Sequence, residues 1–298
     1  MSFTKQIEEE LLRLPLKKTC CRKALALGIA LAARREEQGL VLYSYNGQVA
    51  DLFESLLDRI FHAKTALAQT VRAGKQTWVL TFQSAAISAF LEKVDGASVE
   101  LREAVGFRCA SCEAHFLRGA FLGCATVTDP HKGYHLELLL PTEGRADALS
   151  SLLSETVGKA GRVRRGARHG VCYKNNGAIS DLLYLIGCSK TSFDVTNASI
   201  EREIRNNENR ATNCVARNIS RSVEASQKHR DAIERLTATR KIDTLSEELR
   251  TTAALRMENP DASLTELALM HEPPLTKSGL NRRLQKLLEE AEEVVTEE

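Results

Sequence analysis

The feature that most constrains the fold of this chain is an internal repeat. Beginning at Cys21 the sequence reads CRKALALGIALAAR, and 91 positions later, beginning at Cys112, it reads CEAHFLRGAFLGCA. Both stretches are rich in small residues, and Gly28 in the first aligns with Gly119 in the second. A glycine inside a helix costs about 1 kcal/mol relative to alanine, but it is tolerated where another backbone comes close. We therefore expect two helices that pack face to face.

The segments after each helix repeat in the same order. A strand entered at a glycine follows, GLVLY from Gly39 and GYHLEL from Gly133. A leucine-rich helix, a hairpin and a last helix that opens with AIS come next, at offsets of 91 to 96 residues. This period is too long for a solenoid repeat. Chance matches of Leu, Ala and Gly are the alternative, but the conserved order favours a duplicated αββαββα unit with a pseudo-two-fold axis and two sheets spread as a saddle.

This arrangement resembles the LAGLIDADG homing endonuclease fold, with LRGAFLGCA (Leu117–Ala125) at the position of the motif and ALGIALAAR (Ala26–Arg34) as its partner. The stretches FLRGAFL, DPHKGYHLE and LRMENPDASLTEL…PPLTKSGLNRRL resemble the WhiA family of bacterial sporulation and cell-division transcription regulators, over nearly the whole chain. We therefore expect an α+β fold. Its predicted parts are a LAGLIDADG-like domain over residues 1–200 with repeats at about 15–95 and 109–190, a basic helical connector over 201–242, and an all-α helix-turn-helix domain over 243–298.

The paired helices lack the acidic residues that homing endonucleases use for catalysis. In homing endonucleases an acidic residue near the end of each helix holds a divalent metal for phosphodiester cleavage. The matching positions here are Ala33 and Cys124, and neither a methyl group nor a thiol suits Mg²⁺. Glu36, Glu37 and Asp129 lie past the helix ends and are predicted to be turn and surface residues. We expect no catalytic residue, no metal and no cofactor; a residual metal-dependent DNA endonuclease is the alternative.

The eight cysteines do not indicate a disulfide framework, which is typical of short secreted domains. Cys109 and Cys112 form a CxxC motif, while Cys20 and Cys21 begin the equivalent helix. Parallel packing of the helices would gather these four thiols, which raises a zinc or redox hypothesis. The adjacency of Cys20 and Cys21 argues against a metal, and the sequence leaves the question open. The other four are predicted to be small buried hydrophobic residues: Cys124, Cys172, Cys188 and Cys214.

Two basic segments are candidates for contact with nucleic acid. GKAGRVRRGARHGVCYK is predicted to form a hairpin whose alternating arginines project a row of guanidinium groups toward phosphates; a solvated hairpin that protects a sheet edge is the alternative. Residues 201–241 hold ten Lys or Arg and six acidic residues, and they could contact the DNA backbone or form a solvated connector. The predicted DNA-contacting residues here are Arg162, Arg164, Arg165, Arg168, Arg210 and Arg217.

The last predicted helix, in TKSGLNRRLQKLLEE, carries the strongest functional signal. Leu280, Leu284 and Leu287 occupy positions i, i+4 and i+7, so this side is expected to face the domain core. A preceding helix opens with the capping box of Ser263 and Glu266, and a double proline lengthens the turn between the two helices. The opposite side suits a major groove about 12 Å wide. Its predicted DNA-contacting residues are Lys277, Ser278, Asn281, Arg282, Arg283, Gln285 and Lys286.

The sequence therefore predicts a sequence-specific regulator that binds double-stranded promoter DNA. The WhiA resemblance implies a helix-turn-helix like that of sigma factor region 4, genes of cell division or sporulation as targets, and a second transcription regulator or RNA polymerase as a partner. A protein-interaction scaffold without DNA affinity and an RNA binder are the alternatives. Because no apolar run approaches the roughly 18 residues that a membrane span requires, we expect a cytoplasmic, nucleoid-associated protein without a membrane partner.

Overall fold

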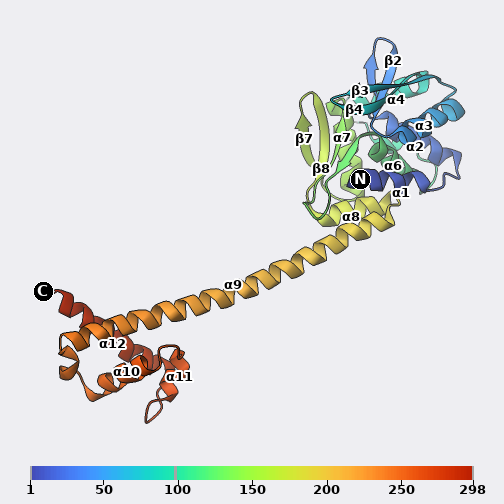
Figure 1. The fold of residues 1–298 in the computed structure, drawn as a ribbon. Coiled ribbons are helices and arrows are strands. Elements are labelled where there is room, and N and C mark those ends of the chain that lie inside the picture. Colours follow the sequence, from blue (N-terminus) through green and yellow to red (C-terminus); the bar gives the residue numbers. More distant parts are fainter. Residues whose placement is uncertain (1, 97–98, 297–298) are drawn as a thin grey trace. The chain divides into compact units, whose positions relative to one another are not determined.

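The computed structural model describes residues 2–96 and 99–296. The chain divides into two compact units, an N-terminal unit of residues 1–203 and a C-terminal unit of residues 204–298. Each unit has its own hydrophobic core, and the long helix α9 (Ser189–Ala238) begins in the first unit and ends in the second (Figure 1).

The N-terminal unit contains the duplicated αββαββα arrangement that the repeat predicts. Helix α1 (Phe3–Arg13) precedes the first half, and α5 (Leu101–Val105), which the sequence did not predict, lies between the halves. The first half consists of α2 (Thr19–Ala30), β1 (Arg34–Glu36), β2 (Gly39–Ser44), α3 (Gly47–Leu56) with a π-helical turn (Leu57–Phe61), β3 (Lys64–Arg72), β4 (Lys75–Gln83) and α4 (Ala85–Asp95). The second half consists of α6 (Cys112–Cys124), β5 (Ala125–Val127), β6 (Leu136–Leu140), α7 (Glu143–Thr156), β7 (Gly161–Arg165), β8 (Arg168–Tyr173) and α8 (Asn176–Leu185).

The two halves carry sheets of the same topology. The strand orders are β1-β2-β4-β3 and β5-β6-β8-β7, and all pairs are antiparallel. Leu42 pairs with Leu80 in the first sheet, and Leu138 pairs with Val171 at the corresponding place in the second. These four residues are buried in the core, so the alternation of strand side chains leaves the other face of each sheet open.

Local sequence explains where the helices of each half begin. Asn46 and Thr142 precede the equivalent helices α3 and α7, and each side chain accepts a backbone N–H of the first turn. Ser84 and Asn175 do the same for the equivalent helices α4 and α8. Such N-caps satisfy amide groups that have no partner inside the helix.

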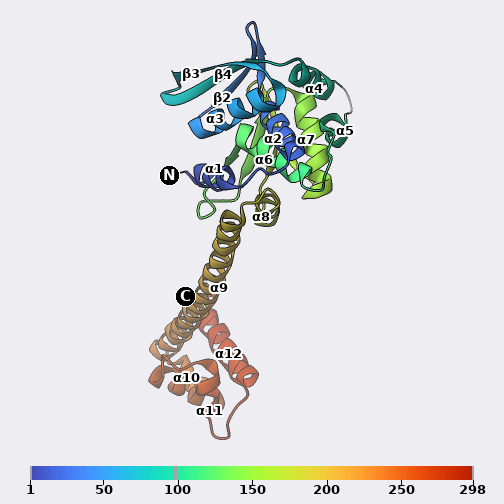
Figure 2. The same ribbon diagram turned by 90° about the vertical axis from the view of Figure 1, so that its right-hand side faces the viewer.

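Helices α2 and α6 pack backbone against backbone at the centre of the unit, side by side in Figures 1 and 2. A Cβ atom added to Gly28 would lie 2.1 Å from the carbonyl oxygen of Phe116, and one added to Gly119 would lie 2.1 Å from that of Leu25. Real side-chain atoms do not approach so closely, so both positions require glycine. The predicted face-to-face packing is confirmed.

The C-terminal unit is entirely helical. After α9 the chain turns at Arg240, and the remaining elements are a 3-10 helix (Lys241–Thr244), α10 (Glu247–Glu258), α11 (Leu264–Leu269) and α12 (Lys277–Thr296). Ser263 and Glu266 form the predicted capping box. The segment between α11 and α12 covers residues 270–276, longer than the three or four residues of a standard helix-turn-helix, as the double proline predicts. Among the described residues, no helix has the length and apolar character that crossing a membrane requires.

Candidate nucleic-acid interface

The outer side of α12 presents a continuous polar surface. Leu280, Leu284 and Leu287 are at most 1% exposed and pack in the core of the C-terminal unit, which fixes the rotation of the helix about its axis. The first turn is capped because Gly279 donates its N–H to the hydroxyl of Thr276 at 3.1 Å. Six of the predicted DNA-contacting side chains are exposed on this helix, and we call them the α12 face: Lys277, Ser278, Asn281, Arg282, Gln285 and Lys286.

Arg283 is the member of the predicted set that the structure separates from the others. Its guanidinium lies 2.9 Å from a carboxylate oxygen of Glu248 in α10, and its side chain is only 23% exposed. The residue therefore fastens α12 to α10. Sequence reasoning grouped it with Arg282 because the two are adjacent, but adjacent residues of a helix point about 100° apart.

The β7–β8 hairpin divides its arginines between two faces, so the prediction of a single arginine row is wrong. Arg165 pairs with Arg168, and Arg164 pairs with His169 on the opposite face. Arg162 shares the face of Arg164 and forms an ion pair with Asp147 of α7. Only the pair Arg165 and Arg168 lies on the open face of the second sheet.

A group of cations lies on the open faces of the two sheets, and sequence reasoning found only part of it. The guanidinium of Arg72 lies 4.0 Å from the centre of the Tyr43 ring, and that of Arg34 lies 5.8 Å from it. Burial, and then the positive charge of Arg34, lower the pKa of Arg168 from its usual value. We call Arg34, Arg72, Arg165 and Arg168 the saddle cations. Arg165 also pairs with the carboxylate of Glu137 at 3.4 Å. Arg34, Arg72 and Arg168 lie close enough for their charges to repel one another, so an anion bound beside these three would be stabilised.

Arg34 and Tyr43 were missed because neither belongs to a basic run. The sequence pattern that could have identified them is the alternation of apolar and polar residues along the strands. Arg34 pairs with Val41, and Tyr43 is two residues beyond Val41, so both face the side of the sheet opposite the leucines.

A buried arginine binds the backbone at Ala33, one of the two positions that the sequence resemblance matches to a metal ligand. Ala33, at the end of α2, is fully buried, and its carbonyl oxygen accepts a hydrogen bond of 2.6 Å from Arg145 in α7. The same guanidinium donates to the carbonyl oxygen of Leu31 at 3.0 Å and makes two hydrogen bonds of 2.8 Å to the carboxylate of Asp95. A fixed cation at this position repels a divalent metal ion.

The surroundings of Asp95 favour its charged form. Burial by itself would raise the pKa of Asp95, but the hydrogen bonds from Arg145 and Thr142 outweigh it and hold the pKa below its usual range. Asp95 is therefore a carboxylate whose oxygens are already occupied by donors.

The other candidate metal ligands near the ends of α2 and α6 are hydrogen-bonded or lie on the surface. The thiol of Cys124 donates to the carbonyl oxygen of Ala120 at 3.1 Å, and burial raises its pKa to about 12, so it is protonated at neutral pH. Glu36 is exposed and accepts the hydroxyl of Tyr43 at 2.7 Å. Asp129 accepts the N–H of His131 in a turn, and Glu37 is exposed.

Helix α9 presents the last two candidates. Arg210 and Arg217 are exposed, in the part of the helix that belongs to the C-terminal unit. Cys214 is exposed beside them, so its prediction as a buried residue is wrong; this stretch of α9 is exposed on every side, although Cys is usually buried. Cys172 and Cys188 are buried as predicted, whereas Cys124 is only half-buried.

Two family models match the chain. One, described as the WhiA LAGLIDADG-like domain, covers residues 113–205, and the other, described as the WhiA C-terminal HTH domain, covers residues 209–291. The first match covers the second half of the N-terminal unit, and the other covers most of the C-terminal unit. Together they define a class of protein in which a LAGLIDADG-like domain precedes a helix-turn-helix domain.

Relatives of nearly equal length narrow this class to one family. A "Probable cell division protein WhiA" from Lachnoclostridium phytofermentans is 33% identical, with 96% of this chain and 97% of that protein covered. A protein of the same name from Caldicellulosiruptor saccharolyticus is also 33% identical, with 99% and 96% covered. The chain belongs to the WhiA family.

A solved structure supports the fold. Full-length DUF199/WhiA from Thermatoga maritima matches with a TM-score of 0.59 at 22% identity, covering 98% of this chain and 99% of that one. The helix-turn-helix and degenerate LAGLIDADG domains of the family support a DNA-binding regulatory role, and the names of the relatives are consistent with a protein that is not an enzyme.

Proposed function

We propose that this protein is a sequence-specific, double-stranded-DNA-binding transcription regulator of cell-division or sporulation genes. The observation that carries the proposal is the α12 face, an exposed polar surface without an acidic side chain, held outward by a fully buried leucine ridge. The proposed organisation is an inactive endonuclease-like domain to residue 200, a basic connector over 201–242 that includes Arg210 and Arg217, and a helix-turn-helix domain over 243–298.

The side chains of the α12 face suit the two kinds of contact that DNA offers. Arg282 can donate two hydrogen bonds to guanine, and Asn281 and Gln285 can do the same to adenine. Lys277 and Ser278 lie in the first turn, where the positive end of the helix also favours a phosphate. In this proposal the residues in the middle of the α12 face contact the DNA bases, and the residues at its ends contact the DNA phosphates.

The N-terminal unit contributes backbone contacts and no cleavage. The saddle cations attract phosphates without regard to sequence. Ala33 and Cys124 leave the two positions that the resemblance matches to endonuclease metal ligands without a carboxylate. Incubation of a supercoiled plasmid with the protein and Mg²⁺ or Mn²⁺ should therefore leave the plasmid intact. The name of the relatives supports cell division as the regulated process, and a second regulator or RNA polymerase would be the partner on the nucleoid.

Arg282→Ala tests base reading by the α12 face. We expect binding to the specific site to weaken by about 1–3 kcal/mol, roughly 5- to 150-fold in Kd, with little change on random duplex DNA. The site comes from genome-wide mapping of bound DNA, and fluorescence anisotropy of the full-length chain measures Kd. Lys286→Ala is the control, expected to weaken both duplexes alike. Equal loss on both duplexes for Arg282→Ala would make Arg282 a phosphate contact.

The saddle cations make a separate prediction about salt dependence. Replacing Arg165 and Arg168 with alanine should reduce the slope of log K against log salt by about two, because each phosphate contact contributes about 0.9. Replacing Arg162 and Arg164 removes the same charge from the other face of the hairpin and should change the slope little. If both double variants have the same slope, the saddle does not contact DNA.

The same titrations separate the other proposed roles. A full-length chain that binds no duplex at low salt would be a scaffold. A chain from which RNA displaces duplex DNA at equal nucleotide concentration would be an RNA binder.

A further inference from the structure

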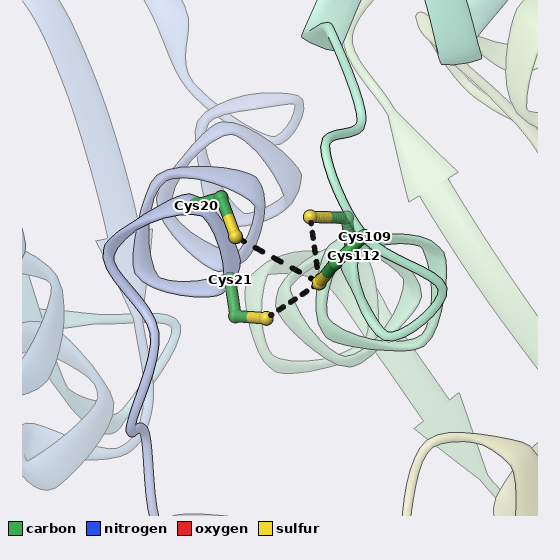
Figure 3. Close-up of side chains that lie close together, drawn as sticks. All are labelled: Cys20, Cys21, Cys109 and Cys112. Carbon is green, nitrogen blue, oxygen red and sulfur yellow. Dashed lines mark hydrogen bonds between the residues drawn. The ribbon is translucent and has the colours of Figure 1, made fainter.

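Four thiols meet where α2 and α6 begin (Figure 3). The sulfur of Cys109 lies 3.7 Å from that of Cys20, 3.6 Å from that of Cys21 and 3.6 Å from that of Cys112. All four sulfurs lie within 4.8 Å of one another. We call these four residues the cysteine cluster. The predicted parallel packing of the helices therefore does gather the thiols, and adjacency in sequence does not keep Cys20 or Cys21 out of the group.

We propose that the cysteine cluster binds one Zn²⁺ ion, which joins the two halves of the N-terminal unit at the beginning of their central helix pair. Neither the family models nor the names of the relatives assign a metal to these residues. The proposal also departs from the expectation, drawn from the sequence, that the chain holds no metal.

The distances between the sulfurs fit a single metal ion. Zinc bound by four thiolates is tetrahedral with Zn–S bonds of about 2.3 Å, so neighbouring sulfurs stand about 3.8 Å apart. The three separations at Cys109 are within 0.2 Å of that value, and the other three, all within 4.8 Å, must shorten by at most about 1 Å. In an iron–sulfur cluster the ligands bind different iron atoms and are spread more widely. Four protein thiolates leave no open position, which is the form of a structural zinc site.

The beginnings of two helices lie beside the cluster. Cys20 and Cys21 lie in the first turn of α2, and Cys112 is the first residue of α6, so the positive ends of both helices point at the sulfurs. Neither helix has a side-chain N-cap there, in contrast to α3, α4, α7 and α8. The N–H of Cys112 donates to the carbonyl oxygen of Cys109 at 3.0 Å, which closes the CxxC turn.

Two of the four cysteines are buried and two are partly exposed, as expected for a metal ion bound at the edge of a hydrophobic core. Cys21 and Cys112 are at most 2% exposed and belong to the core, whereas Cys20 and Cys109 are partly exposed. An ion can enter from the exposed side and then be shielded from water by the other two ligands. Because the ligands come from both halves and exist together only in the folded chain, binding energy becomes folding energy.

The direct test is the metal content of the full-length chain, purified with a reductant and analysed by mass spectrometry for metals. We expect one equivalent of zinc per chain. The double variant Cys109→Ser/Cys112→Ser should retain less than a tenth of it, whereas Cys214→Ser, an exposed cysteine of α9, should retain all. A chelator should lower the Tm of the wild type but not that of the double variant. A mercurial reagent, which bonds to the thiolates in place of the metal, should release the zinc as the four thiols of the cluster react.

Cobalt substitution keeps the test independent of whether the double variant folds. Wild-type protein stripped of metal and titrated with Co²⁺ should show the strong visible absorption of tetrahedral cobalt and a thiolate-to-cobalt charge-transfer band, saturating at one equivalent. Three results would each overturn the proposal. The first is a protein that keeps four free thiols and binds no zinc after incubation with Zn²⁺. The others are iron as the bound metal and a disulfide between Cys109 and Cys112 in the protein as isolated.

Discussion

Replacing Arg145 with leucine should lower the free energy of unfolding of the N-terminal unit by about 3–5 kcal/mol, because it breaks a buried ion pair by removing one partner. Arg145 is 1% exposed, and its loss leaves the Asp95 carboxylate and the carbonyl oxygens of Leu31 and Ala33 without their donors. Urea unfolding followed by the fluorescence of Trp78 measures this, because the only tryptophan of the chain lies in β4 of this unit.

An exposed ion pair supplies the matched control. Arg35 pairs with Glu92 at 3.0 Å, but the two side chains are 48% and 66% exposed, so Arg35→Leu should cost less than about 1 kcal/mol. If Arg145→Leu costs no more than Arg35→Leu, the buried network is not what holds α7 against the end of α2.

Acid provides a second readout of the same pair. The folded-state pKa of Asp95 lies below the unfolded value of about 3.9, so the unfolded chain binds the proton more readily. The stabilisation is complete above that unfolded value and is lost as the pH falls through the folded pKa. Wild-type protein should therefore lose more stability than Arg145→Leu between pH 5 and 2, a range set by about one unit above and two below the unfolded value.

Replacing Gly119 with alanine should destabilise the same unit by about 3 kcal/mol or more, the upper end of the range for overpacked cores. The new Cβ would lie 2.1 Å from the carbonyl oxygen of Leu25 and 2.9 Å from its carbonyl carbon, so α2 and α6 must move apart. The clash outweighs the gain in helix propensity of about 1 kcal/mol that alanine brings. The same Trp78 fluorescence follows the transition.

Gly177→Ala is the control for this prediction, because the substitution is identical and also falls within a helix, α8. Its added Cβ would have no neighbour closer than the side-chain oxygen of Asn175 at 3.7 Å. We expect this variant to be neutral or more stable by up to about 1 kcal/mol. A Gly119→Ala protein as stable as Gly177→Ala would show that the helix pair is looser than the structure has it.

The fold was predictable where local pattern and internal repetition agree. The two glycine-containing helices, the offset between the halves and the leucine spacing of α12 all depend on periodicity, which a single sequence displays. The capping box at Ser263 and Glu266 depends on a spacing of three residues, and the structure contains it. Helix α5 escaped notice because a helix of five residues has too few turns to show a period.

The site was less predictable, because its charges are sorted by contacts between distant residues. Arg145 lies in a helix with nothing in its neighbourhood to mark it, and its partner Asp95 is 50 positions away. Arg162 and Arg165 look alike in the sequence, but strand register places them on opposite faces. Arg283 is distinguished from Arg282 only by Glu248 in another helix. The α12 face, in contrast, follows from helical periodicity alone, and its role in DNA binding stays a prediction.

The two hydrophobic cores share no residue among those that the structure describes. Heat should therefore melt the chain in two separate calorimetric transitions, with zinc raising only the one that belongs to the first core and a cognate oligonucleotide raising the other. Separate folding of the two units also affects which substitutions can accumulate during evolution. If the proposed function holds, substitutions in the α12 face need to be tolerated only by the small helical core, so DNA specificity can change while the N-terminal unit stays intact.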